Sequence, residues 1–226
     1  QIQDRPQWKT VSGGSRRYVQ KIVDALDDAR LNCPVLRVER RDAAVDVHTA
    51  HGIESFDAVV MACHAPTSLA VLDATEQERG VLQAFRYQEN RAVLHTDIRL
   101  LPRRKKVWSA WNYLSTGQTQ HDQPVAVSYL LNQLQALPFA QPVIVTLNPT
   151  IEPAPELILR ELRYEHPVLD GATARGQSHL PAIQGVDRVW FCGAWTGYGF
   201  HEDGLKSALH VVRDFGVEIP WEAVYD

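Results

Sequence analysis

The chain has 226 residues, of which 45% are hydrophobic and 22% are charged, so it can bury a sizeable core in one or two domains. A net charge of −4 gives no support for nucleic-acid binding, and no stretch approaches the apolar length that crosses a bilayer. Three widely spaced cysteines, Cys33, Cys63 and Cys192, lie in apolar segments and favour reduced thiols over disulfides. We therefore expect a cytoplasmic protein with no transmembrane segment.

The first residues predict that the native beginning of the protein is missing. Gln1 is not an initiator, and the only methionine is Met61. No charged and then apolar signal pattern precedes Trp8.

The first predicted helix covers residues 16–26 and follows a Gly13-Gly14 loop, in which the glycine pair permits a tight turn. Ser15 is the expected N-terminal cap of this helix. Its apolar face consists of Tyr18, Val19, Ile22 and Leu26.

Strand-like segments come next. Two short alternating runs, at residues 35–38 and 45–48, predict a hairpin. The apolar run at residues 56–63 predicts a strand in a sheet that is covered on both faces.

The middle of the chain predicts a sheet. Thr75 and Glu78 form a capping box that opens a helix through Phe85. Strands without long helices between them predict an antiparallel or mixed sheet, and a short helix over residues 172–180 follows. The predicted strands cover residues 92–98, 107–114, 125–131, 143–147 and 157–164.

The most informative segment covers residues 189–205. It predicts a buried strand, a turn with glycines at positions 193, 197, 199 and 204, and a helix that begins near Asp203. The first turn of a helix has free N–H groups and a partial positive charge, which suits an anionic or electron-rich ligand. The same pattern also occurs in α/β proteins as a tight turn without a ligand. The helical face at this end is made of Leu205, Leu209, Val212 and Phe215.

Aromatic and basic residues suggest a substrate pocket in the middle segment. The basic run at residues 103–106 is interpreted first as a solvated turn, with a basic lip for an anionic substrate or lipid as the alternative. Trp108 and Trp111 differ by an odd offset, so a single strand would turn them to opposite faces. We choose Trp111, with Asn112 and Tyr113, as the candidate substrate pocket.

Three polar residues, His201, Glu202 and Asp203, open the C-terminal helix. The two acids suit helix capping and the helix macrodipole. His201 is the candidate catalytic residue, because imidazole titrates near neutrality and can transfer a proton. A metal site is disfavoured, since His48 and His51 have no Cys or carboxylate pair at ligand spacing.

The segment Phe-Cys-Gly-Ala-Trp at 191–195, with Gly-Phe-His-Glu-Asp-Gly-Leu-Lys-Ser-Ala at 199–208, resembles the second FAD-binding motif of the flavin-containing amine oxidoreductase superfamily. It is most similar to a bacterial branch of NAD/FAD-binding oxidoreductases. The resemblance implies FAD as the cofactor and an α/β (α+β) fold. In that fold, part of an FAD/NAD(P)-binding Rossmann-like domain (residues 1–64 and 184–226) carries an inserted mixed or antiparallel β-sheet substrate domain (residues 65–183).

The resemblance also implies which residues meet the cofactor. Gly193, Ala194 and Trp195 would approach the pyrophosphate, and the amides of Gly204 and Leu205 would stabilise negative charge on the reduced flavin. The implied cofactor-binding residues are Val38, Gly193, Ala194, Trp195, Asp203, Gly204 and Leu205. The first motif of the family, GxGxxG, is not in this chain, so the resemblance is to the C-terminal half of a longer flavoprotein.

The implied function is that of an FAD-dependent oxidoreductase, which takes a hydride from a C–N or C–C centre of a small-molecule or lipid-like substrate. The expected partner is the missing N-terminal nucleotide-binding half, and the chain alone would be incomplete and inactive. The alternative is a catalytically inactive binding or scaffold module that needs a partner chain.

Overall fold

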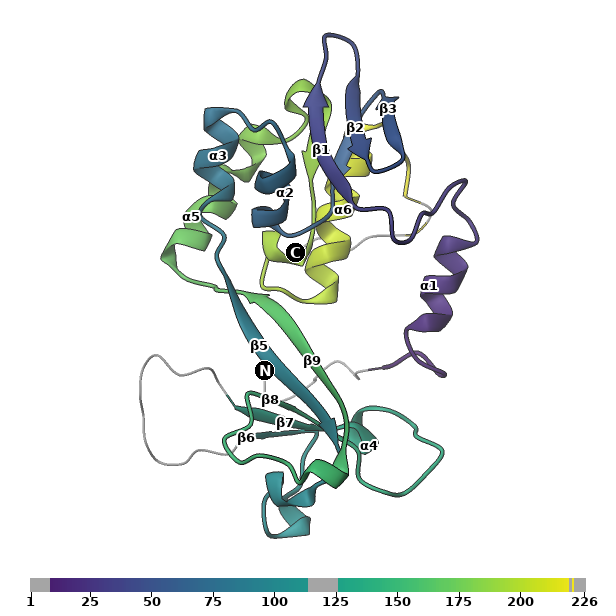
Figure 1. The fold of residues 1–226 in the computed structure, drawn as a ribbon, viewed down its shortest axis with the longest axis vertical. Coiled ribbons are helices and arrows are strands. Elements are labelled where there is room, and N and C mark those ends of the chain that lie inside the picture. Colours follow the sequence, from purple (N-terminus) through teal and green to yellow (C-terminus); the bar gives the residue numbers. More distant parts are fainter. Residues whose placement is uncertain (1–8, 114–125, 220, 222–226) are drawn as a thin grey trace. The chain divides into compact units, whose positions relative to one another are not determined.

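A computed structural model describes residues 9–113, 126–219 and 221 (Figure 1). The chain forms two compact units, of which unit 1 comprises residues 1–29 and 89–165, and unit 2 comprises residues 30–88 and 166–226. Both units mix helices with sheets, and the larger sheets are antiparallel. The predicted α/β (α+β) class is therefore confirmed.

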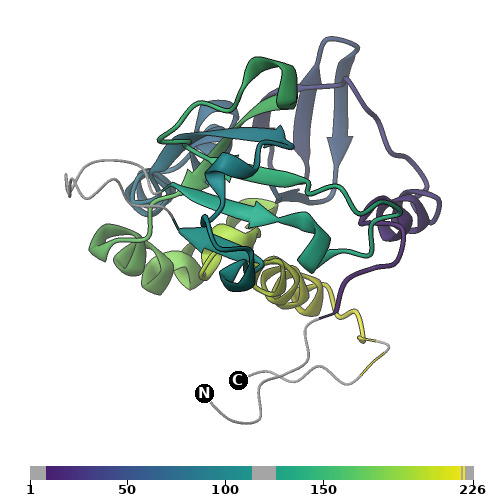
Figure 2. The ribbon, with the colours of Figure 1, turned by 90° about the horizontal axis from the view of Figure 1, so that it is seen from below.

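Unit 1 is built on a five-stranded sheet with the order β6-β7-β8-β5-β9, whose strands lie side by side in Figure 2. The pairs β6/β7, β7/β8 and β5/β8 are antiparallel, with Ser128 opposite Thr146 and His95 opposite Ile144. Leu101, Leu130 and Ile144 form a small core on one face. The elements are α1 (Arg16–Val23), β5 (Tyr87–His95), β6 (Trp111–Tyr113), β7 (Val127–Leu130), α4 (Leu131–Leu134), β8 (Ile144–Leu147) and β9 (Ile158–Pro167), with 3-10 turns η1 (Ile98–Leu100), η2 (Lys105–Val107) and η3 (Pro155–Leu157).

The predicted strands of unit 1 exist, with shifted ends. The strand expected at 107–114 is only three residues long because η2 occupies its beginning, and positions 114 and 125 lie outside the described residues. Helix α1 ends at Val23, three residues earlier than predicted, and it buries none of its residues. Ser15 precedes it but makes no capping bond with its side chain.

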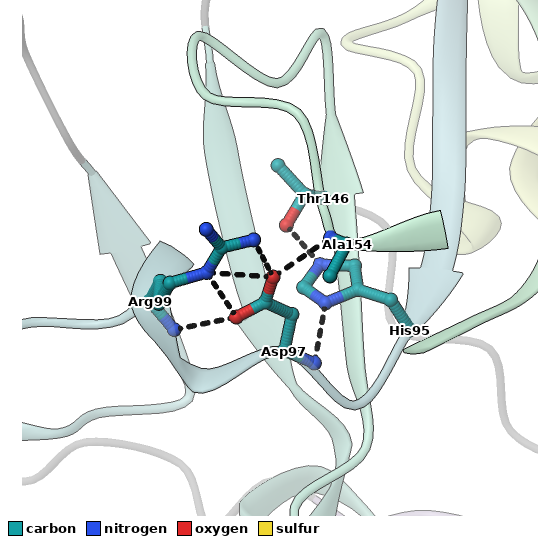
Figure 3. Close-up of polar contacts among 5 residues, drawn as sticks. All are labelled: His95, Asp97, Arg99, Thr146 and Ala154. Atoms are coloured by element: carbon teal, nitrogen blue, oxygen red, sulfur yellow. Dashed lines mark hydrogen bonds and ion pairs between the residues drawn. The ribbon is translucent and has the colours of Figure 1, made fainter. Parts of the chain in front are cut away.

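A polar cluster is buried in unit 1 (Figure 3). The Asp97 N–H donates to Nδ1 of His95 at 3.1 Å, and Nε2 of His95 is 2.8 Å from Oγ1 of Thr146. Thr146 Oγ1 is in turn 2.8 Å from Oγ of Ser128. The Asp97 carboxylate accepts from the Arg99 guanidinium and, at 2.9 Å, from the Ala154 N–H. The cluster therefore joins strands β5, β7 and β8 to the loop before η3.

Unit 2 contains a three-stranded antiparallel sheet and a two-stranded parallel one. The first has the order β1-β2-β3, and the second pairs β4 with β10. The predicted hairpin is thus part of a three-stranded sheet, and the strand predicted over 56–63 is shorter, because β3 ends at Phe56 before β4 begins. The elements are β1 (Val35–Arg40), β2 (Val45–Thr49), β3 (Gly52–Phe56), β4 (Val59–Met61), α2 (Ala65–Val71), α3 (Glu76–Leu82), α5 (Gly171–His179), η4 (Leu180–Ile183), η5 (Val186–Arg188), β10 (Val189–Phe191), η6 (Ala194–Thr196) and α6 (His201–Asp214).

The core of unit 2 explains where the units divide. Leu82, Phe85 and Ile183 are almost completely buried in one hydrophobic cluster with Val189 and Phe191. Residues 65–88 and 166–183 therefore pack with the parallel strands of unit 2, whereas the sequence placed both segments in the substrate domain. Within the described part of the chain, every helix is too short or too polar to cross a membrane.

Candidate functional site

Strand β10 leads into the glycine-rich turn. Val189 and Phe191 are fully buried, and β10 runs parallel to β4 with Phe191 opposite Met61. The chain leaves the strand at Gly193 with φ 144° and ψ 163°, a conformation that side chains rarely allow. A Cβ at Gly193 would lie 2.7 Å from the Trp195 indole nitrogen. Glycine at 193 is therefore required by the fold of the turn itself.

The turn is held by side chains from outside it. Oγ of Ser207 accepts the Gly193 N–H at 2.9 Å, and Nε2 of Gln177 donates to the carbonyls of Trp195 at 3.1 Å and Gly197 at 2.8 Å. The indole of Trp195 is 3% exposed and donates to the Cys63 carbonyl at 3.1 Å. No pattern in the sequence marks Gln177, whereas Ser207 lies within the segment 199–208 that carries the family resemblance. These hydrogen bonds within the protein hold the backbone of the turn in place without a ligand.

Asp203 acts within the turn. One of its carboxylate oxygens accepts the Tyr198 N–H at 3.1 Å and the Phe200 N–H at 2.9 Å. A Cβ at Gly197 would lie 2.5 Å from the other oxygen. The predicted capping role of this residue is present, and the carboxylate predicted to meet the cofactor is engaged with the protein.

Helix α6 begins at His201, two residues before the predicted start. His201 is exposed there, in the first turn, where the backbone N–H groups have no partner within the helix. The Gly204 N–H donates to the Phe200 carbonyl at 3.2 Å, so this amide is engaged within the helix. The helix positions that have no carbonyl partner four residues earlier within α6 are 201–203, directly before Gly204.

The apolar face of α6 also differs from the prediction. Its buried residues are Ser207, Leu209 and Val211, whereas Leu205 is 45% exposed and Phe215 is 44% exposed. The helix is thus turned so that the small Ser207 faces Gly193 and Leu205 remains at the surface beside Gly204.

Gly204 and Ala194 lie against each other. A Cβ at Gly204 would meet the N, Cα and Cβ of Ala194 at 3.6–3.9 Å, which are ordinary contact distances. The structure therefore brings together Gly193, Ala194 and Gly204 from the predicted set, and a methyl group at Gly204 would fit against Ala194.

Val38 lies on β1, in the antiparallel sheet of unit 2. Its side chain is 1% exposed in the core, and its carbonyl accepts the Asp73 N–H at 3.1 Å. Both groups are engaged within the unit.

A pocket of about 670 Å³ lies beside the turn in unit 2. Pro181 and Gln184 line it from the η4 side, and Ser207, His210 and Val211 line it from α6. Burial raises the pKa of the neighbouring Cys192 thiol, which stays protonated near neutral pH. Cys33, Cys63 and Cys192 form no disulfide.

The candidate substrate residues of unit 1 occupy two faces of the sheet. Trp111 and Tyr113 are 53% and 66% exposed on one face, where Trp111 packs edge-on against Tyr129. Asn112 is buried on the other face, and its amide bonds to the backbone of Ser109 and Ser128. The three predicted residues therefore cannot line one pocket together. The reason is the two-residue period of a strand.

The basic run at residues 103–106 is exposed, in line with a solvated turn. Trp108 instead packs on the core of unit 1 and donates from Nε1 to the Pro102 carbonyl at 2.7 Å. Among the residues that the structure describes, no three His, Cys, Asp or Glu side chains form a group that could hold a metal ion.

Comparisons with known proteins find a family model that matches part of the chain. The family model for flavin containing amine oxidoreductases matches residues 3–97, which is less than half of the chain. No curated protein sequence matches the chain. The predicted flavin cofactor agrees with the family that matches.

Solved structures match over most of the chain. A fatty acid isomerase from P. acnes, which produces CLA, has a TM-score of 0.67 at 15% identity, and the alignment covers 90% of this chain and 52% of the isomerase. Putrescine oxidase bound to putrescine gives 0.61 at 13% identity, with 90% and 53% covered. Cyclohexylamine oxidase from Brevibacterium oxydans IH-35A gives 0.59 at 12%, with 90% and 53% covered. The chain has the fold of the corresponding part of these enzymes and spans about half of their length.

Proposed function

We propose that this chain supplies the second part of an FAD site in an FAD-dependent oxidoreductase. The observation that carries the proposal is the β10–Gly193–α6 segment, in which a rigid glycine turn follows a buried parallel strand and faces the first turn of a helix. Ligands of open α/β sheets bind outside the carboxyl ends of the strands, which is where this turn lies. The flavin family match and the shared fold add to it.

The residues at the turn fit a flat, electron-rich ligand. Gly204 leaves an open Cα surface beside Ala194, and the first-turn N–H groups of α6 offer donors and a partial positive charge. Gly193, Trp195 and Asp203 shape this surface, since their polar groups bond to the protein. Leu205 would cover the ligand with its exposed side chain. Val38, which lies in unit 2 as the turn does, remains a proposed contact of the cofactor.

FAD, when bound, supplies an acceptor for a hydride equivalent from a C–N or C–C centre of a small or lipid-like substrate. The protein's own part is to orient the flavin and to exclude water from it. We assign His201 the transfer of a proton, because it is exposed in the first turn of α6. The exposed aromatic face of Trp111 and Tyr113 in unit 1 is the proposed substrate surface, without Asn112.

A second candidate is an inactive binding or scaffold module that needs a partner chain. The coverage favours it for the chain alone, because about half of each matching enzyme has no counterpart here. On either proposal the partner is a nucleotide-binding portion that carries the first FAD motif, and the location is the cytoplasm.

The Gly204→Ala variant tests the flavin proposal. The side chain fits the protein, and alanine in place of glycine within a helix favours folding by about 0.5–1 kcal/mol. The same methyl group would stand where the flavin is proposed to approach. We expect a chain that is slightly more stable and that retains several-fold less FAD.

The matched control is Gly80→Ala, which adds a methyl group to α3 with no atom within 4 Å. Each variant is co-expressed with the polypeptide encoded directly upstream. Released flavin is then quantified by its visible absorption. Equal flavin in both variants would refute the approach at Gly204, and no flavin in any sample would favour the scaffold module.

A further inference from the structure

The loop between β5 and β6 carries a dense run of positive charge. Its four basic residues at 103–106 are consecutive and exposed. The sequence has no acidic residue between Asp97 and Asp122, although the whole chain has a net charge of −4. Like charges that are held side by side repel one another, so this loop favours a partner of opposite sign.

Carboxylates of the protein do not neutralise this run. None of the four side chains contacts a carboxylate in the part of the chain that the structure describes. By contrast, Arg91, Arg99 and Arg163 of the same unit each form an ion pair with an acidic residue. The four cations are therefore available to an anionic partner.

The loop is anchored on the core of unit 1, so its cations are held at a defined place. Leu100 and Leu101 are buried near its start. At its end, Nε1 of Trp108 donates to the Pro102 carbonyl at 2.7 Å, and the Lys105 ammonium lies 5.8 Å from the centre of the Trp108 ring. Figure 1 shows the loop, in teal, projecting from the sheet of unit 1.

Exposed apolar side chains flank the cations. Ile98 of η1 is 46% exposed, and Val107 of η2 is 58% exposed. A soluble polyanion such as nucleic acid attracts cations alone, whereas a lipid surface also takes up apolar groups between its headgroups. The stems of Arg and Lys are themselves apolar and can lie along such a surface. The combination favours a lipid surface over nucleic acid.

We propose that the loop over residues 98–107 contacts the surface of a membrane that contains anionic lipids. The four cations would lie at the headgroups, with Ile98 and Val107 at the boundary to the acyl chains. Clusters of four or more Lys and Arg bind the anionic lipids of the cytoplasmic leaflet in this way. The inference goes beyond the flavin proposal and does not depend on it, because none of these residues belongs to the turn at Gly193.

Helix α1 is another basic segment of unit 1 with exposed apolar residues, and it is the weaker candidate. Its three cations are followed closely by Asp24, Asp27 and Asp28. These carboxylates lie within the range over which charges act on one another in salt, so they offset the cations. The loop at 98–107 has no such acids.

Sedimentation of the 226-residue chain with lipid vesicles tests the proposal. One set of vesicles contains equal parts of phosphatidylglycerol and phosphatidylcholine, and the other contains phosphatidylcholine alone. We expect binding to the first set only, with a loss of binding as the salt concentration rises. The double variant Arg103→Gln/Arg104→Gln should bind about 25-fold more weakly, at about fivefold for each lost cation.

Arg16→Gln/Arg17→Gln is the matched control, because it removes an exposed pair of arginines from α1 in the same unit. It should bind the anionic vesicles nearly as tightly as the wild type. An equal loss of binding in both double variants would show that the total charge, and not the loop, determines binding, and would overturn the inference.

Val107→Ser separates a lipid surface from a soluble polyanion. It removes an apolar group but no charge, so binding to the anionic vesicles should weaken several-fold. Leu159→Ser, at a β9 position that is 59% exposed, should leave binding unchanged. Binding that is insensitive to Val107→Ser would reject the lipid assignment, as would a wild-type chain that binds neither set of vesicles. None of these measurements involves flavin, so their failure would leave the flavin proposal standing.

Discussion

His95 should make unit 1 sensitive to mild acid. The imidazole is completely buried, and both ring nitrogens are used in the neutral form. Because Nδ1 accepts the Asp97 N–H, the ring proton is on Nε2 and is donated to Thr146 (Figure 3). A second proton, on Nδ1, would point at the Asp97 N–H, so two hydrogen-bond donors would face each other without an acceptor. Burial lowers the pKa of His95, and the charge of Asp97 opposes this only in part.

The sign of the effect follows from the lowered pKa. Above about pH 6.5, the pKa of an unfolded histidine, the contribution of neutral His95 is fully present. As the pH falls below that value, His95 is protonated in the unfolded chain but stays neutral in the folded one. The free energy of unfolding therefore decreases until the pKa of folded His95 is reached. One proton limits the slope to about 1.4 kcal/mol per pH unit. Arg99 keeps the pKa of Asp97 far below its usual range, so that carboxylate stays charged throughout.

The assay is hydrogen exchange of the β5 and β8 amides between pH 7.5 and 5, corrected for intrinsic exchange rates, because these amides report unit 1. His95→Asn keeps an acceptor for the Asp97 N–H but does not titrate, so its opening free energy should lose this slope. His51→Asn, at an exposed histidine, should keep it. An identical slope in all three proteins would show that His95 does not control acid sensitivity.

Three further predictions concern unit 2. Ser207→Ala leaves the half-buried Gly193 N–H without its partner and should lower the free energy of unfolding by about 1–3 kcal/mol in denaturant titration. Arg40→Met removes the ion-pair partner of fully buried Glu78 and should cost about 3 kcal/mol, and a loss below about 0.5 kcal/mol would show that the pair is not structural. His201→Ala should leave the melting temperature and flavin content unchanged but slow turnover of the reconstituted enzyme, and unaltered turnover would remove its proton-transfer role.

Local chemistry predicted local structure well. The capping box was predicted from Thr75 and Glu78, and the structure has both of its bonds, at 2.8 Å and 3.2 Å. The strand, turn and helix around Gly193 were also predicted in the right order. In each case, the interacting residues are within a few positions of one another, so their types and spacing are enough to predict the local structure.

Long-range partners were not predictable in this way. Met61 and Phe191 are neighbours in a parallel sheet although about half of the chain separates them. The two apolar runs do not indicate which residue of one strand lies opposite which residue of the other. The same holds for Gln177 and Gln184, whose amides bond to backbone groups that any residue could present. A glutamine in a helix or a loop has no pattern that distinguishes this use from solvation.

The four glycines of the turn show how a motif can mix two kinds of information. Gly193 and Gly199 have φ values of 144° and 88°, and Gly197 has no room for a side chain beside Asp203. Folding alone accounts for these three, so their substitution would disturb the protein whether or not a ligand binds. Gly204 is different, since its backbone is helical and a methyl group would fit. Of the four, only Gly204 is not required to be glycine by the fold of the chain. It is therefore the position at which a loss of flavin can be separated from a loss of structure.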